Sequence, residues 1–325
     1  MTKKLKDALV TRWPQNLRHL LFLAVVFVFA FAIAALNQCE VNAATAKNSA
    51  KDDKSAGESR WTKLDGAKIH YVNYGKGNEA LVLVHGWTQN VDGWRDQAAD
   101  LAKRSRVIAI DLPGHGQSDK PQTTYSMDYF ARAVEAVMRD AKVKRAVLVG
   151  HSMGTPVARQ FYRKYPEKTI GIVIVDGALR PFGDKALMDR MIAGFRSPKF
   201  REAAQPMFVA MSGPNLQPEA KDRITASFMN TPQHVVVSAM EGMVDASIWG
   251  EDKITVPVLA VMAKNQFYPP NVEESFRGIA PTMEFYMWDG VGHFLMMEKP
   301  KEFNDVVLAF LNKNKLLMKS EIRIQ

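Results

Sequence analysis

From about residue 60 onward the sequence repeats one pattern: a short apolar run, a turn that contains glycine, and a helical stretch. The runs ALVLVHG, RVIAIDLPG, RAVLVG and TIGIVIVDG are apolar almost throughout, as strands buried on both faces are. TVPVLAVMA and TMEFYMWDG continue the series. Near-continuous apolar strands that alternate with helices predict a parallel β-sheet with helices packed on both faces.

The remaining elements of this pattern can also be placed from the sequence. WTKLDGAKIHYVNYG predicts a hairpin that turns at Asp65-Gly66. Helical periodicity predicts helices over Trp94–Lys103, from an N-cap at Ser126 to Asp140, over Thr155–Tyr165 and over Lys301–Leu311.

One stretch interrupts the alternation. Residues 178–252 contain no buried-strand pattern, and they are too long for a loop in a compact domain. We therefore expect a helical cap inserted between two strands. We expect most of its Met and Phe side chains to form the cap's own core, and a few to line an apolar pocket over the active site. These side chains are Met188, Met191, Phe195, Met207, Phe208, Met211, Phe228, Met229, Met240 and Met243.

The N-terminal 43 residues have the features of a targeting segment. A basic stretch precedes the uncharged run Leu20–Leu36, and small-residue cleavage patterns end at Ala43 and Ala46. These features favour a cleaved secretory signal, with an uncleaved inner-membrane anchor at residues 20–36 as the alternative. In both cases the basic flank stays inside, so we expect an exported catalytic part, periplasmic or secreted.

Composition limits the remaining possibilities. The 325 residues carry a formal net charge of +9, but basic residues are not clustered with aromatic ones, so we expect no nucleic-acid partner. The single cysteine, Cys39, excludes an internal disulfide. The predicted organisation is a signal or anchor over residues 1–43, a flexible tether over 44–59, a core over 60–177 and 253–315, and the cap over 178–252.

The five residues GHSMG, 150–154, lie between a predicted strand and a predicted helix. A Gly-x-Ser-x-Gly motif in this context places the serine on a strained turn, with its hydroxyl projecting over the edge of the sheet. Ser152 is therefore the candidate nucleophile. Because a serine hydroxyl is a weak nucleophile until a base removes its proton, a histidine must lie nearby.

Of the seven histidines, His293 is the best candidate for this base. It lies in a loop flanked by glycine after the last predicted strand, at the same edge of the sheet as Ser152. We expect His85 and His115 to brace loops, and His151 to shape the turn beside the nucleophile.

The ordered motifs LVLVHGW, DLPGHGQSDKP, VGHSMG and GVGHFLMMEKPKEF, within residues 60–312, resemble those of the α/β-hydrolase fold family. The similar group includes esterases, carbon–carbon bond hydrolases, lactonases, cofactor-free haloperoxidases and dehalogenases. The resemblance implies a mostly parallel eight-stranded sheet with an inserted cap, Ser152 as nucleophile and His293 as base. It also implies that the backbone amides of Trp87 and Met153 form the oxyanion hole, and both side chains are candidates for the pocket wall.

The third member of the triad departs from the usual family pattern. The acid is usually written Gly-x-x-Asp after the strand that here reads VPVLAVMA, but this chain has Ala263 and Gln266 at those positions. Some members of the family carry the acid after the preceding strand, where this chain has Asp176. We therefore expect Asp176 to be the acid, with Asp289 and Asp184 as weaker candidates, and we expect Asp111 and Asp119 to be structural.

These features predict a carboxylesterase-like serine hydrolase that acts through an acyl-enzyme on a small to medium apolar ester and needs no metal or organic cofactor. A lactonase or a carbon–carbon bond hydrolase on the same triad is one alternative. A binding protein with the hydrolase fold and little turnover is another, and the Gln266 substitution keeps that alternative open.

Overall fold

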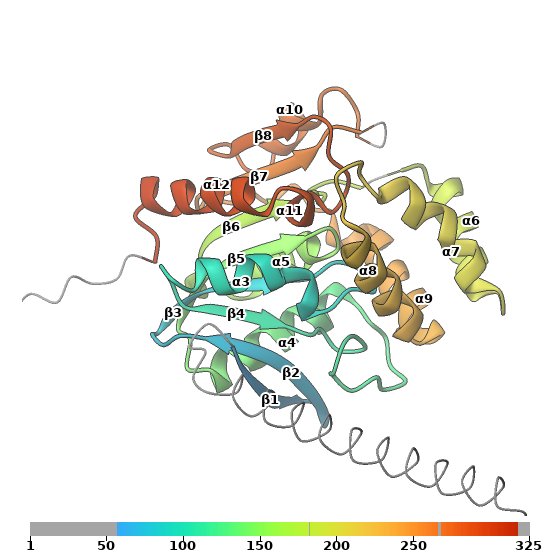
Figure 1. Ribbon diagram of the computed structural model, residues 1–325, viewed down its shortest axis with the longest axis horizontal. Helices are drawn as coiled ribbons and strands as arrows, with labels where there is room; N and C mark the ends of the chain where they lie inside the picture. Colours follow the sequence, from blue (N-terminus) through green and yellow to red (C-terminus); the bar gives the residue numbers. More distant parts are fainter. Residues whose placement is uncertain (1–56, 182, 266–267, 318–325) are drawn as a thin grey trace, which may run out of the picture. The chain divides into compact units, whose positions relative to one another are not determined.

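An eight-stranded sheet organises the part of the chain that the computed structural model describes, residues 57–181, 183–265 and 268–317 (Figure 1). The strands follow the spatial order β1-β2-β4-β3-β5-β6-β7-β8. β1 and β2 run antiparallel to their neighbours, and the pairs from β4 to β8 are all parallel. The expectation of a mostly parallel eight-stranded sheet is therefore confirmed. The strands are β1 (Glu58–Leu64), β2 (Ala67–Tyr74), β3 (Glu79–Val84), β4 (Val107–Ile110), β5 (Arg145–His151), β6 (Thr169–Val175), β7 (Val258–Ala263) and β8 (Glu284–Trp288).

The predicted hairpin and helices are present, with small shifts at their ends. Asp65 and Gly66 turn between β1 and β2 with φ of 51° and 86°, the left-handed pair that a tight two-residue hairpin requires. The Ser126 hydroxyl accepts a hydrogen bond from the Tyr129 amide, so it is the N-cap of α4. The helices outside the inserted segment are η1 (Val91–Trp94), α3 (Arg95–Leu101), α4 (Met127–Asp140), α5 (Gly154–Lys164), η2 (Pro166–Lys168), α10 (Val272–Arg277), α11 (Leu295–Glu298) and α12 (Pro300–Lys313).

Side chains that alternate along the strands build a hydrophobic core on each face of the sheet. In β3, Val82 and Val84 pack with residues of α4 and α5, whereas Leu81 and Leu83 pack with residues of α3 and α12. All four are completely buried. Both faces of the sheet are thus covered, and its strands end at an edge where loops can carry chemistry.

Between β6 and β7 the chain forms four helices that lie together at one end of the sheet (Figure 1). We call this group the cap: α6 (Lys185–Arg196), α7 (Phe200–Met211), α8 (Pro218–Asn230) and α9 (Gln233–Val244), followed by the short η3 (Ala246–Ile248).

A buried arginine of α5 holds both ends of the cap. The Arg159 guanidinium donates to the carbonyls of Leu179, before the cap, and Gly250, after it. Arg159 is 1% exposed and also pairs with Asp252, and burial lowers its pKa to about 10. A single cation therefore joins the two connections between the cap and the core.

Within the described residues, no helix has both the length and the apolarity needed to cross a membrane. The predicted signal or anchor over residues 20–36 and the tether before Gly57 lie outside the described residues. Their assignment stays a prediction.

Candidate active site

Ser152 lies on a strained turn at the end of β5. Its φ is 52°, a left-handed conformation that non-glycine residues seldom adopt. The glycines on either side allow this turn, because a Cβ at Gly150 or Gly154 would overlap backbone atoms of Gly154 or Val84, respectively. The Ser152 amide donates to the Val175 carbonyl at 3.0 Å, which ties the turn to β6. This is the geometry that the Gly-x-Ser-x-Gly motif predicts.

His293 and Asp176 form a hydrogen-bonded pair at the same edge of the sheet. His293 Nδ1 lies 2.6 Å from Asp176 Oδ2. The other carboxylate oxygen, Oδ1, accepts the Ala263 amide at 2.8 Å, and Asp176 is 1% exposed. Because the carboxylate only accepts, the His293 proton lies on Nδ1, and Nε2 is left as the acceptor for the Ser152 hydroxyl.

The other candidate acids are engaged elsewhere. Asp289 is largely exposed and pairs with Lys264. Asp184 caps α6 through the Leu187 amide, and Asp119 accepts the Lys68 amide. The Asp111 carboxylate binds His70. Asp176 is thus the candidate acid that the structure brings to His293, and Gln266, at the usual position of the acid, lies outside the described residues.

The two amides expected to form the oxyanion hole flank the serine. The loop after β3 approaches so closely that a Cβ at Gly86 would lie 3.1 Å from Ser152 Cβ, and Trp87 follows directly. Met153 precedes the first residue of α5. Neither the Trp87 nor the Met153 amide donates to another group within the described residues, so both are available to an oxyanion.

A cavity of about 800 Å³ contains Ser152, Asp176 and His293 in its wall. Of the ten Met and Phe residues singled out in the inserted segment, eight line this cavity. This corrects the expectation that most of them form the cap's own core. The physical reason is that the same side chains can serve both purposes, because Phe195, Met240 and Met243 belong to the hydrophobic core and also line the cavity. The eight are Met188, Met191, Phe195, Met207, Phe208, Met211, Met240 and Met243.

Trp87 and Met153 differ as candidates for the pocket wall. Trp87 lines the cavity. The Met153 side chain does not, because it is completely buried in the hydrophobic core beside α5. This corrects the expectation for Met153, which contributes its backbone amide only.

The Trp87 side chain contacts all four cap helices. Its indole Nε1 donates to the Val236 carbonyl of α9 at 2.9 Å. Its ring is stacked on Phe208 of α7, with an interplanar angle of 6°. The centroid of the ring lies 5.0 Å from that of Phe195 in α6 and 6.1 Å from that of Phe228 in α8. One residue therefore joins the oxyanion loop to the cap, a role that the sequence pattern did not indicate.

The loop of His293 is also attached to the cap. The His293 amide donates to the Met211 carbonyl at the end of α7. Glu298 accepts the amides of Gly292, in the histidine loop, and Asn215, between α7 and α8. These bonds fix the backbone immediately before the His293 side chain.

Three further histidines support the site without being free to act as its base. His151 Nε2 bonds to the His293 carbonyl at 2.9 Å, and burial, with the neighbouring His293, lowers its pKa well below the usual value. His85 Nδ1 bonds to the Gly86 carbonyl, and its Nε2 accepts the Leu112 amide. Burial lowers the pKa of His115 to about 3, and its ring lies 5.0 Å from that of His85. His85 and His115 thus brace the loops after β3 and β4, as predicted.

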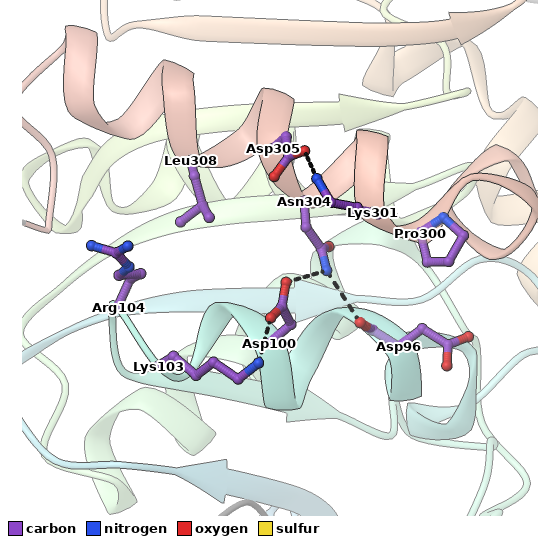
Figure 2. A pocket seen from close by; sticks show the side chains of 9 residues that line it. All are labelled: Asp96, Asp100, Lys103, Arg104, Pro300, Lys301, Asn304, Asp305 and Leu308. Atoms are coloured by element: carbon purple, nitrogen blue, oxygen red, sulfur yellow. Dashed lines mark hydrogen bonds and ion pairs between the residues drawn. The ribbon is translucent and has the colours of Figure 1, made fainter.

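A second hollow lies between α3 and α12 (Figure 2). Its volume is about 600 Å³, and Asn304 donates to Asp100 at its centre. None of the lining residues is a serine, cysteine or histidine, so no Ser-His or Cys-His pair lies in this hollow. Within the described residues, no group of three His, Cys, Asp or Glu side chains could hold a metal ion. The lining residues are Asp96, Asp100, Lys103, Arg104, Pro300, Lys301, Asn304, Asp305 and Leu308.

Comparison with known proteins agrees with the fold. Residues 79–217 match a family model described as the alpha/beta hydrolase fold. A 2-hydroxy-6-oxononadienedioate/2-hydroxy-6-oxononatrienedioate hydrolase of Burkholderia vietnamiensis is 28% identical over 267 residues, which cover 76% of this chain and 91% of that protein. A dihydrolipoyllysine-residue acetyltransferase component of the acetoin cleaving system of Cupriavidus necator is 30% identical over 163 residues. This chain spans 43% of the length of that relative.

Two solved structures illustrate the likeness, and each covers about three quarters of the chain. Est816, described as an N-acyl homoserine lactone degrading enzyme, is 29% identical with a TM-score of 0.68, over 77% of this chain and all of that one. An esterase from Exiguobacterium antarcticum has a TM-score of 0.72 at 19% identity, over 78% of this chain and all of that one. The second likeness concerns the fold alone.

Proposed function

We propose that this chain, whose residues 79–217 match the alpha/beta hydrolase fold model, is a serine hydrolase that cleaves a carboxylic ester of a small to medium apolar substrate. The observation that carries the proposal is the hydrogen bond between His293 and Asp176 in the cavity that Ser152 lines. Such an arrangement supplies a nucleophile, a base and a carboxylate that orients the base.

The first half of the reaction follows from the hydrogen bond between His293 and Asp176. Asp176 holds the His293 proton on Nδ1, so Nε2 accepts the proton of Ser152 as its Oγ attacks the ester carbonyl. The amides of Trp87 and Met153 donate to the oxygen as negative charge develops on it. His293 then gives its proton to the leaving alcohol, and the acyl group stays on Ser152.

Water completes the cycle by the same steps in reverse. His293 accepts a proton from water, hydroxide adds to the acyl carbon, and the acid leaves as Ser152 recovers its proton. Asp176 stays ionised throughout and stabilises the imidazolium that forms in each half-reaction.

The walls of the cavity support an apolar substrate. Eight methionine and phenylalanine residues of the cap line the cavity that contains the triad, and methionine adapts to ligands of different shape. A cavity of about 800 Å³ has the size of sites for small organic ligands rather than polymers. An acyl or aryl group of modest length fits this environment.

A second candidate function is the cleavage of a lactone or of a carbon–carbon bond on the same triad. The named activities of the lactone-degrading structure and of the Burkholderia hydrolase favour it. Hydrolysis of a lactone would proceed by the steps above, but the alcohol that leaves the carbonyl carbon would stay attached to the acyl group through the opened ring. A panel of esters, lactones and ring-fission ketones, compared by kcat/KM, separates these classes.

The proposal is tested by turnover of p-nitrophenyl esters of increasing acyl length. Ser152→Ala should abolish turnover. Ser212→Ala is the matched control, because Ser212 lines the same cavity but its hydroxyl donates to the Phe208 carbonyl and has no base. Equal turnover by the native chain and Ser152→Ala would contradict the proposal. No turnover of any ester, together with no labelling of Ser152 by a fluorophosphonate, would favour a binding protein.

We also propose that the chain is exported through its N-terminal segment. The basic flank and the uncharged run Leu20–Leu36 support this proposal. The N-terminal residue of protein recovered from a periplasmic fraction distinguishes cleavage near Ala43 or Ala46 from an uncleaved anchor. Full-length protein in the cytoplasmic fraction would contradict export.

A further inference from the structure

A second serine, histidine and aspartate lie in hydrogen-bonded series at the antiparallel end of the sheet. Ser59 is in β1, His70 is in β2, and Asp111 follows β4. Ser59 Oγ lies 2.6 Å from His70 Nε2, and His70 Nδ1 lies 2.7 Å from Asp111 Oδ2. The proposed hydrolase mechanism does not use any of the three.

The hydrogen bonds of Asp111 define the tautomer of His70. Asp111 Oδ1 accepts the Val91 amide, and Oδ2 accepts the Gln117 amide as well as the histidine. Because this carboxylate only accepts, the imidazole proton lies on Nδ1 and Nε2 presents its lone pair to the hydroxyl of Ser59. His70 and Asp111 are 0% and 1% exposed, so water does not compete for either group.

Ser59 is the member of this series that faces solvent. Beside it lies Trp61, which is 50% exposed and whose ring centroid is 4.9 Å from that of His70. The indole thus covers the imidazole and leaves an apolar surface next to the serine hydroxyl. An electrophile can reach Ser59 from water and rest an aromatic or alkyl group on Trp61.

We propose that Ser59 is a second reactive serine, which takes an acyl or phosphonyl group from an activated ester. Ser59 Oγ attacks the electrophilic carbon or phosphorus, its proton passes to His70 Nε2, and the bond to the leaving group breaks. With a fluorophosphonate the new bond is O–P, and fluoride leaves. This reaction does not depend on the function proposed for Ser152.

The adduct on Ser59 is stable rather than an intermediate in turnover. Ser59 lies within a strand, whereas Ser152 lies at a strand-to-helix turn beside amides that can hold an oxyanion. Loss of such a donor costs ~10²–10³ in rate, so Ser59 reacts more slowly than Ser152. The result is a modification site at the edge of the sheet.

The test uses full-length protein that carries Ser152→Ala and a fluorophosphonate probe, with the modified serine mapped by peptide mass spectrometry. Ser247 is the internal control, because it is exposed and its hydroxyl has no histidine partner within the described residues. A general base contributes ~10²–10⁴ in rate, so Ser59 should be labelled at least ~100-fold faster than Ser247. Labelling at comparable rates would overturn the proposal.

Two further variants in the same background locate the source of the reactivity. Ser59→Ala should lose the label, and His70→Gln should slow labelling of Ser59 by at least ~100-fold, provided that its thermal unfolding midpoint shows a folded protein. Unchanged labelling in a folded His70→Gln protein would overturn the proposal. If His70→Gln does not fold, the ratio of the labelling rate of Ser59 to that of Ser247 decides whether the proposal stands.

Discussion

Substitution of Asp176 by asparagine tests the triad most directly, because both oxygens of the carboxylate accept hydrogen bonds from N–H donors. Oδ1 accepts the Ala263 amide, and Oδ2 accepts His293 Nδ1. Asparagine has one oxygen, so one donor must lose its acceptor. If the oxygen faces Ala263, the amide NH₂ faces His293 and favours the tautomer whose proton lies on Nε2. That tautomer cannot accept the proton of Ser152.

The expected loss is large and confined to chemistry. Asparagine at this position of a Ser-His-Asp triad lowers kcat by ~10⁴, or about 5.5 kcal/mol of transition-state stabilisation. KM should change by less than about threefold, because the apolar wall that binds the substrate is intact. The assay is the steady-state hydrolysis of the best p-nitrophenyl ester, followed at saturating substrate concentration.

Asp289→Asn is the matched control for Asp176→Asn. Asp289 lies close to His293 in sequence, but it is 76% exposed and pairs with Lys264, so kcat should stay within about twofold. A folded Asp176→Asn protein that keeps more than about a tenth of the native kcat would refute the reasoning. The acid would then have to come from another residue.

Three further predictions follow from packing and burial. Trp87→Phe loses the bond to the Val236 carbonyl, so kcat/KM should fall about fivefold for about 1 kcal/mol lost, and an unchanged value would argue against a link between cap and oxyanion loop. A Cβ at Gly154 would overlap the Val84 carbonyl, whereas one at Gly93 would have its nearest neighbour at 3.5 Å. Gly154→Ala should therefore lower the free energy of unfolding, measured in urea, by about 3 kcal/mol, and Gly93→Ala should lower it by under about 0.5 kcal/mol. Burial lowers the pKa of His115 to about 3, below about 6.5 in the unfolded chain. The stability that neutral His115 contributes is therefore complete above pH ~6.5 and falls by about 2 kcal/mol at pH 5. Urea titrations at pH 7.5 and 5 should show this loss, His115→Gln should reduce it, and equal stability at both pH values would contradict the prediction.

The sequence predicted the sheet well because its strands are buried on both faces. Their near-continuous apolar runs leave few other structures open, and the order of the glycine-containing loops then places Ser152 and His293 at one edge. Asp176 became the candidate acid because it ends one of these strands at a position where some members of the similar family carry the acid. Whether the Asp176 carboxylate reaches His293, by contrast, depends on side-chain geometry. The hydrogen bond between them is visible only in the structure.

The cap was harder to predict in detail. Its helices have apolar residues on more than one side, so periodicity does not distinguish a side chain in the cap's interior from one over the cavity. The contacts of Trp87 with four helices, and the series Ser59, His70 and Asp111, join residues far apart in the chain. No local pattern in a single sequence reports such contacts.

The bond between the His293 amide and the Met211 carbonyl has a consequence for how such a protein can diversify. The same inserted segment that lines the cavity also supports the backbone of His293. Exchange of this segment between relatives would therefore alter selectivity and the alignment of proton transfer together. New specificities in this lineage should arise more readily by substitution along the inner faces of α6 and α7 than by replacement of the whole segment.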